Sequence, residues 1–230
     1  MNVFIGLLIA AMVGAIIFLS LNTAPQDKRK AYLKKLKDFL EGNLESIEGE
    51  DDSYRITFHY KNNEFVYEDI QQHTFGDRVF YQGYLRVNTG TNLVLSFTER
   101  ERTAMRDSVS SLQDIHSPWK QNIGKVMLPE DLNRFKLFTN EPALAQRLLA
   151  DEEVVKIFVK FINMDRRAHP VMSLEVLEGI VVLRFYSSGG FRPSLFDLVE
   201  NYTAIEPYLE IMTYMTGRIR KVKQDIDMLK

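Results

Sequence analysis

The segment from Ser187 to Ser194 carries the residue types best suited to binding an anion. Its sequence is Ser-Ser-Gly-Gly-Phe-Arg-Pro-Ser, and it lies between a predicted strand and the start of a predicted helix. Backbone amides, hydroxyl groups and a guanidinium at a helix N-terminus bind phosphate or carboxylate. Glycines between a strand and a helix are also ordinary turn residues, so a plain connection is the competing interpretation. The predicted ligand-binding residues are Ser187, Ser188, Gly189, Gly190 and Arg192.

The remaining side chains that do chemistry in other proteins form no catalytic motif here. The four histidines, at positions 59, 73, 116 and 169, follow no metal-binding spacing such as HExxH. The chain has no cysteine, which excludes a Cys–His zinc site. It also lacks the GxSxG, Walker and GxGxxG patterns. The sequence therefore predicts a non-enzymatic protein with no metal and no cofactor.

Residues 3 to 21 form an uninterrupted apolar segment that predicts one membrane-spanning helix. At the rise of an α-helix its length is roughly 28 Å, close to the thickness of the hydrocarbon core of a bilayer. A cleaved signal peptide is the alternative, but the segment is longer than a typical apolar core and has no basic segment before it. Basic residues follow it, so the N-terminus is expected outside the inner (plasma) membrane and the remainder in the cytoplasm.

Two groups of residues are expected to act around this predicted span. Gly6, Ala10 and Gly14 repeat every four residues on one helix face, where small side chains let two membrane helices approach closely. The basic residues after the span are expected to bind lipid headgroups, and they are Lys28, Arg29, Lys30, Lys34, Lys35 and Lys37. Membrane lipid and another membrane protein are therefore expected partners.

Changes in hydrophobic period divide the chain into three parts. Residues 1–25 form the predicted anchor, and residues 26–47 form the predicted amphipathic helix beside the membrane, whose apolar pattern runs from Asp27 to Glu41 and stops at Gly42. Residues 48–230 form a predicted α+β domain, which begins at an acidic break. Acidic and basic residues nearly balance, with a net charge of −2, so no extended positive surface is expected to bind nucleic acid.

Alternating apolar residues predict antiparallel strands between residues 53 and 98. The clearest alternation is at residues 54–60, and further β-prone runs follow at 65–69, 78–87 and 93–97. The short polar turns between these runs predict a four-stranded meander. Residues 99–131 are predicted to be a long connection with short helical pieces.

The next part of the domain is predicted to contain a strand, a helical pair and a hairpin. The strand covers residues 134–138, and Asn140 and Asp151 are the predicted N-caps of the two helices that follow. Residues 172–177 and 180–186 are predicted to pair as a hairpin through a turn at Glu178–Gly179.

The C-terminal segment, from about residue 203 to 230, has an apolar heptad repeat that predicts a long helix. Ile205 and Tyr208 begin a spacing of alternately three and four residues. A helix packed on its own domain uses a similar stripe, so for the portion after Gly217 intramolecular packing and a coiled-coil contact stay equal alternatives. The residues predicted to form a seam with a partner helix are Met212, Met215, Ile219, Val222, Ile226 and Leu229.

Two apolar patterns carry a family resemblance: the segment Phe135–Leu149, and Gly179–Phe185 followed by Phe191 and Pro193. Over about residues 133–230 the chain resembles a family of uncharacterised bacterial membrane-tethered proteins, known only as a domain of unknown function. The resemblance implies an α+β cytoplasmic domain and no known activity. It assigns no functional residue.

These patterns together predict an α+β fold with a single N-terminal transmembrane helix, an antiparallel sheet with hairpins, a helical pair and a long C-terminal helix. The leading hypothesis is a membrane-tethered, non-enzymatic interaction or assembly module at the cytoplasmic face of the inner membrane. It is expected to form a homo-oligomer or to bind another membrane protein. The alternative hypothesis is a membrane-bound sensor that binds a small anionic ligand through residues 187–194.

Overall fold

The structure, a computed structural model, describes residues 25–72, 80–99, 126–163, 171–185 and 202–229. The helices within these ranges are α2 (Pro25–Phe39), η1 (Glu130–Leu132), α5 (Pro142–Leu148), α6 (Glu152–Asn163), η3 (Tyr202–Ile205) and α7 (Glu206–Asp227). The strands are β1 (Asn43–Ser46), β2 (Tyr54–Tyr60), β3 (Asn63–Gln72), β4 (Phe80–Asn88), β5 (Leu95–Glu99), β6 (Phe135–Thr139), β7 (Val171–Leu177) and β8 (Ile180–Phe185).

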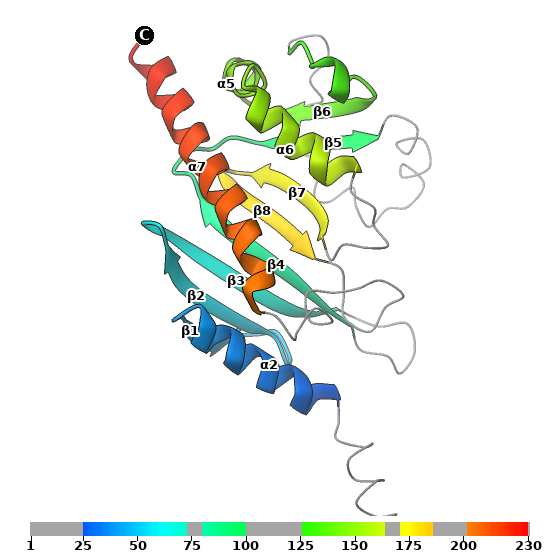
Figure 1. Cartoon of the computed structure of the whole chain (residues 1–230), viewed down its shortest axis with the longest axis vertical. Coiled ribbons are helices and arrows are strands. Elements are labelled where there is room, and N and C mark those ends of the chain that lie inside the picture. Colours follow the sequence, from blue (N-terminus) through cyan, green and yellow to red (C-terminus); the bar gives the residue numbers. More distant parts are fainter. Residues whose placement is uncertain (1–24, 73–79, 100–125, 164–170, 186–201, 230) are drawn as a thin grey trace, which may run out of the picture.

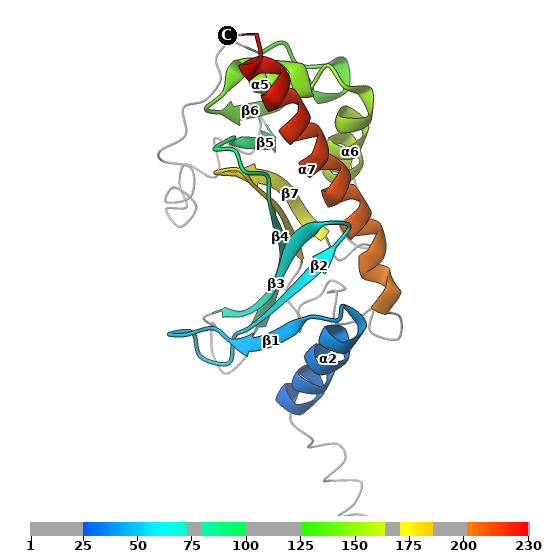
Figure 2. The same ribbon diagram turned by 90° about the vertical axis from the view of Figure 1, so that its left-hand side faces the viewer.

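The strands of the described residues form one eight-stranded sheet in the order β1-β2-β3-β4-β8-β7-β5-β6. Every neighbouring pair is antiparallel. Two perpendicular views show α2, α6 and α7 on the same side of this sheet (Figures 1 and 2). The predicted α+β class is confirmed.

One strand of the predicted meander lies elsewhere in the sheet. β2, β3 and β4 pair in sequence order, as predicted, but the β7–β8 hairpin lies between β4 and β5. The segment after β4 therefore crosses the end of this hairpin instead of turning back along β4. Thr89 N donates to the Gly179 carbonyl at 2.8 Å, and Gly179 N donates to the Leu93 carbonyl at 2.7 Å.

The hydrophobic core lies between the helices and the sheet face that they cover. Leu33 and Leu36 of α2 are buried in it, as are Phe58, Phe65 and Leu85 of the sheet. The heptad repeat of α7 contributes the buried side chains Met212, Met215, Ile219 and Val222. This part of the predicted partner seam packs within the domain, which is the intramolecular alternative.

The helix that follows the predicted anchor ends close to the predicted stop at Gly42. α2 ends at Phe39, and β1 begins at Asn43, within the predicted segment 26–47. Glu41 has a positive φ of 51°, and Gly42 N donates to the Lys37 carbonyl at 3.0 Å. A Cβ on Gly42 would lie 2.8 Å from Ile56 Cγ2, so this glycine lets the chain turn closely against β2.

The two predicted helix caps behave differently. Asp151 Oδ1 accepts hydrogen bonds from Glu153 N at 3.0 Å and from Val154 N at 3.4 Å, which confirms this cap. Asn140 does not cap α5, because its side chain bonds to Val94 N at 2.8 Å and to the Asn92 carbonyl at 2.7 Å. The Asn140 side chain therefore holds the loop before β5 in place and does not cap α5.

The predicted single-pass membrane helix is not supported. No helix within the described ranges is long and apolar enough to cross a membrane. The segment 3–21, on which that prediction rests, lies outside the described residues, as do Gly6, Ala10 and Gly14. The predictions of a transmembrane helix and of a location in the inner membrane are corrected on this finding.

Candidate interaction surface

The residues expected to bind small ligands are mostly outside the described part of the chain. This holds for Ser187, Ser188, Gly189, Gly190 and Arg192, and for three of the four histidines. His59 is exposed and lies 4.0 Å from the Glu64 carboxylate. Within the described residues no three His, Asp or Glu side chains are placed to hold a metal ion.

The basic residues of α2 do not form one exposed group. Arg29, predicted with its neighbours to bind lipid headgroups, is only 3 % exposed, so its assignment to the surface is corrected. It lies four residues before Leu33 and seven before Leu36, in phase with the buried face of the helix. Three of the other basic residues, Lys30, Lys34 and Lys35, are exposed. Lys37 is half-buried, and its Nζ lies 2.7 Å from the Asp38 carboxylate. The side chain of Lys28 is not among those that the structure describes.

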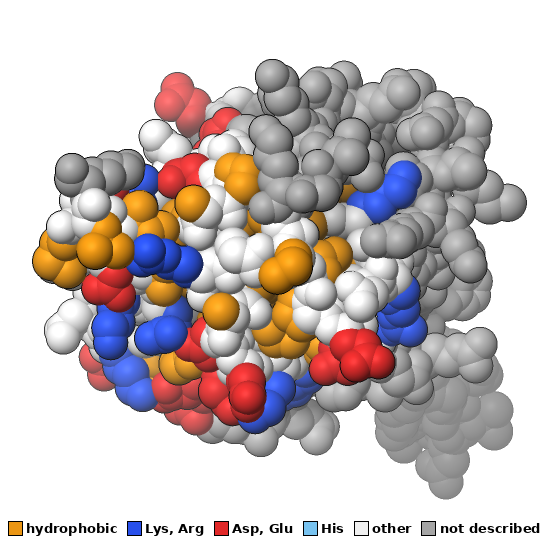
Figure 3. Space-filling model, turned by 90° about the horizontal axis from the view of Figure 1, so that it is seen from above, with side chains coloured by type: hydrophobic (Ala, Val, Ile, Leu, Met, Phe, Trp, Pro, Cys, Tyr) orange, Lys and Arg blue, Asp and Glu red, His pale blue; other side chains and the backbone are white. Residues whose placement is uncertain are grey.

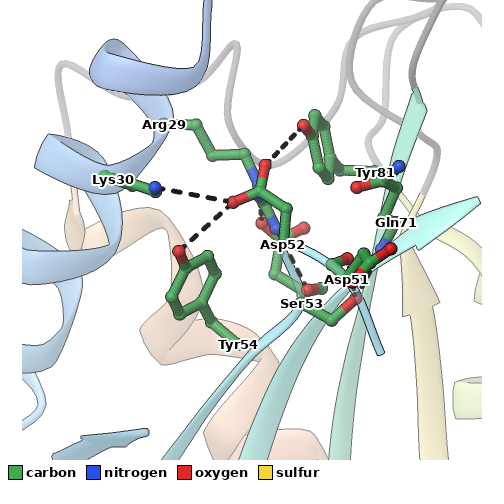
Figure 4. A network of polar contacts seen from close by, with 9 residues as sticks. Arg29, Lys30, Asp51, Asp52, Ser53, Tyr54, Gln71 and Tyr81 are labelled. Carbon is green, nitrogen blue, oxygen red and sulfur yellow. Dashed lines mark hydrogen bonds and ion pairs between the residues drawn. The ribbon is translucent and has the colours of Figure 1, made fainter. Parts of the chain in front are cut away.

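Arg29 is the centre of a buried polar network that joins α2 to the sheet (Figure 4). Its Nε donates to Asp69 Oδ2 at 2.5 Å, and its Nη2 donates to the Asp69 carbonyl at 3.1 Å. Its Nη1 lies 3.1 Å from Asp52 Oδ2, and its Cζ lies 3.5 Å from the centroid of the Tyr81 ring. Asp52 also accepts hydrogen bonds from the hydroxyls of Tyr81 and Tyr54, at 2.8 and 3.2 Å. The network therefore fixes the first turns of α2 on three strands.

The charges of this network are balanced, which favours a structural role. Two carboxylates, Asp52 and Asp69, face two cations, Arg29 and Lys30. Burial raises the pKa of Asp69, and the Arg29 guanidinium opposes that rise. Since both tyrosine hydroxyls already donate to Asp52, the network presents no free nucleophile or proton-transfer group.

A second row of charged side chains crosses the sheet face turned away from the core. Glu68 on β3 is 3 % exposed, and it lies 2.8 Å from Arg55 on β2 and 2.8 Å from Arg86 on β4. Farther along, Arg184 on β8 lies 3.5 Å from Glu175 on β7. Opposite charges on neighbouring strands stabilise the pairing of those strands. Each of these carboxylates has a basic partner, so the row also has the character of a structural element.

A groove lies between α7 and the segment that follows β4, and we name it the α7 groove. Its volume is about 500 Å³, and it is shallow and open to solvent. Its loop wall is Thr89, Gly90 and Thr91. Figure 3 looks onto the end of the molecule that carries the C-terminus and shows hydrophobic and charged side chains intermixed there. The helix wall is one face of α7, formed by Arg220, Lys223, Gln224, Asp227 and Met228.

The loop wall of the α7 groove is held by hydrogen bonds to neighbouring elements. Thr89 donates to the Gly179 carbonyl through its backbone N at 2.8 Å and through its Oγ1 at 2.6 Å. The Asn140 side chain donates to the Asn92 carbonyl at 2.7 Å. A site whose walls are already ordered loses little conformational entropy when it binds a partner.

Arg220 links the two walls of the α7 groove through neutral oxygens. Its Nε donates to the Thr89 carbonyl at 3.2 Å, its Nη2 to the Asn88 carbonyl at 2.7 Å and its Nη1 to Asn63 Oδ1 at 2.8 Å. No carboxylate from the described part of the chain pairs with it. The guanidinium is therefore fixed in position, and no carboxylate of the described residues neutralises its positive charge.

Lys223, one turn farther along α7, is compensated. It lies 2.9 Å from Glu141, and this bond is the main reason that the pKa of Lys223 is raised, with a smaller contribution from Asp227. Arg220 thus differs from Lys223 in having no carboxylate partner among the described residues. Sequence reasoning missed it because residues 88–91 and α7 are more than a hundred residues apart.

No protein-family model, no curated protein and no solved structure matches this chain. The family resemblance of residues 133–230 accordingly stays a prediction. The function is inferred from the described residues themselves, and above all from the α7 groove and the end of the helix that forms it.

Proposed function

We propose that this protein is a non-enzymatic interaction module whose copies assemble with one another through the C-terminal end of α7. This end comprises residues 220–229 and includes the helix wall of the α7 groove. The proposal keeps the predicted homo-oligomer. It rests above all on one observation, which is that the heptad stripe of α7 continues past the point where the domain buries it.

The apolar stripe changes from buried to exposed along the last turns of α7. Val222 is 6 % exposed, Ile226 is half-buried and Leu229 is 73 % exposed. Met228, which lines the α7 groove, is 69 % exposed. Figure 1 shows the last turns of α7 extending beyond the sheet. Exposed apolar side chains beside a preformed groove are typical of a contact with another protein.

The charged side chains near this stripe suit the rim of such a contact. Lys221 and Arg220 are exposed on the same turns of α7, and Lys223 is half-buried. Protein interfaces commonly combine an apolar centre with a polar rim. The predicted anion-binding loop lies outside the described residues, so the sensor alternative gains no support.

The proposal predicts that the double variant Met228→Ser/Leu229→Ser weakens self-association. Burial of each side chain contributes roughly 1.5–3 kcal/mol, so loss of both is expected to raise the dissociation constant about 100-fold or more. Sedimentation velocity of the full chain over a range of concentrations measures this change. The matched control is Met172→Ser, which truncates an exposed methionine on β7, and it should associate as the wild type does. A wild-type chain that sediments as a monomer at every concentration would contradict the proposal.

A further inference from the structure

The turn between β1 and β2, which we name the acidic turn (residues 48–51), carries three exposed carboxylates. Glu48, Glu50 and Asp51 have no ion-pair partner within the described ranges. Backbone hydrogen bonds order the turn, from Ile47 N to the Ser53 carbonyl at 2.9 Å and from Glu50 N to the Ile47 carbonyl at 3.2 Å. The turn projects from the sheet at the lower left of Figure 2. It is therefore an ordered, negatively charged protrusion.

The α7 groove holds one guanidinium, that of Arg220, which can receive a carboxylate of such a protrusion, and the carboxylate of Asp227 lies two turns farther along its helix wall. A guanidinium has five N–H donors, and the neutral oxygens around Arg220 use three of them, which leaves two for a carboxylate. Hydrogen bonds between a guanidinium and a carboxylate are roughly twice as strong as neutral ones. A Cβ on Gly90 would meet nothing within 4 Å, so this part of the loop wall is open to an approaching chain.

The acidic turn and the α7 groove lie at opposite ends of the molecule. The C-terminal end of α7 is at the top of Figures 1 and 2, and β1 is near the bottom of both. The same chain therefore presents the two surfaces to different neighbours. A contact between unlike surfaces is head-to-tail, and it adds further copies unless the chain of copies closes into a ring.

We infer that the acidic turn of one copy docks into the α7 groove of the next, with Arg220 as the anchor for its carboxylates. The inference rests on the proposed function and names the second surface that the assembly uses. Opposite charges at this contact also imply that added salt weakens the assembly.

Two complementary variants test this contact. Gln224→Glu/Met228→Glu places two negative charges in the groove, at exposed side chains that make no hydrogen bond within the described residues. Glu50→Lys/Asp51→Lys reverses the charge of the turn. Each variant alone is expected to associate at least about tenfold more weakly than the wild type in sedimentation velocity. An equimolar mixture of the two is expected to form dimers and nothing larger, because only one intact turn and one intact groove remain in each pair of chains.

The matched control is Glu130→Lys/Asp131→Lys, which reverses an exposed Glu–Asp pair on η1 and should leave assembly unchanged. If the wild type associates but the turn variant associates equally well, or if the mixture forms no dimer, the inference is overturned and the proposed function stands. If the wild type is a monomer, both fall. Each variant should have the same midpoint of thermal unfolding as the wild type, which shows that a loss of assembly is not a loss of fold.

Discussion

Replacing Arg29 by methionine is expected to lower the free energy of unfolding by about 3–5 kcal/mol. The change removes the cation from a buried network, and it leaves the Asp69 carboxylate without the bond from Nε and the Asp69 backbone carbonyl without the bond from Nη2. It also removes the guanidinium that stacks on Tyr81. Urea denaturation followed by circular dichroism measures the loss. Lys34→Met is the matched control, because Lys34 is an exposed residue of the same helix and its loss should change stability by no more than about 0.5 kcal/mol.

The loss in the Arg29→Met variant should depend on pH in a defined direction. Burial raises the pKa of Asp69 above its ordinary value, and removing Arg29 removes the charge that opposes this rise. An acid whose pKa is raised by folding destabilises the folded state above that pKa and not below it. The difference from the wild type should therefore shrink as the pH falls through the raised pKa. A difference that stays constant between about pH 8 and pH 4 would show that the Asp69 charge is not its source.

Gly179→Ala is expected to destabilise the domain by about 2–4 kcal/mol. Gly179 has a φ of 78°, a conformation that costs other residues roughly 1–2 kcal/mol. A Cβ there would lie 1.7 Å from the Thr91 carbonyl oxygen, so the loop after β4 must move. That movement strains the hydrogen bonds that join Gly179 to Thr89 and Leu93, each worth about 1 kcal/mol. Thermal and urea unfolding both measure this effect.

Gly90→Ala separates the steric clash from the backbone conformation. Gly90 also has a positive φ, 70°, but a Cβ there meets nothing within 4 Å. Its loss of stability should be limited to the conformational cost of about 1 kcal/mol. Equal losses in the Gly90→Ala and Gly179→Ala variants would mean that contact with Thr91 contributes nothing.

The parts of the fold that depend on neighbouring residues were predictable from the sequence. The turn at Glu178–Gly179 joins β7 and β8 as expected, with positive φ values of 51° and 78° at the two positions. Asp151 caps α6 through bonds to residues two and three positions later. β5 was misplaced because its neighbours in the sheet, β7 and β6, follow it in the chain, and no local pattern indicates an inserted hairpin.

The position of Arg29 along the helix indicated burial, but the lysines around it favoured a place on the surface. Five lysines surround it in the sequence, and a run of basic residues beside an apolar segment favours a surface role. Arg29 lies on the same helix face as Leu33 and Leu36, and this spacing indicates that its side chain is buried. Phase alone does not identify Asp69 as its partner, because that carboxylate comes from β3, forty residues later.

The heptad repeat of α7 shows where periodicity stops being informative. A spacing of 3.5 residues is compatible with packing on a sheet and with packing on another helix. The structure buries Met212 to Val222 within the domain and leaves Leu229 exposed, so one pattern covers two environments. The α7 groove was equally inaccessible to prediction, because its walls meet only in the folded chain.

The contact at the C-terminal end of α7 is tested most directly by disulfide trapping, which the absence of cysteine from the chain makes specific. Gln224→Cys and Glu50→Cys full chains are mixed under mild oxidation, and Gln224→Cys is mixed with Glu130→Cys as the control. A disulfide requires Cβ atoms within about 4.5 Å. The first mixture should therefore form linked dimers at least about tenfold faster than the control mixture. Equal rates in the two mixtures would contradict docking of the acidic turn in the α7 groove.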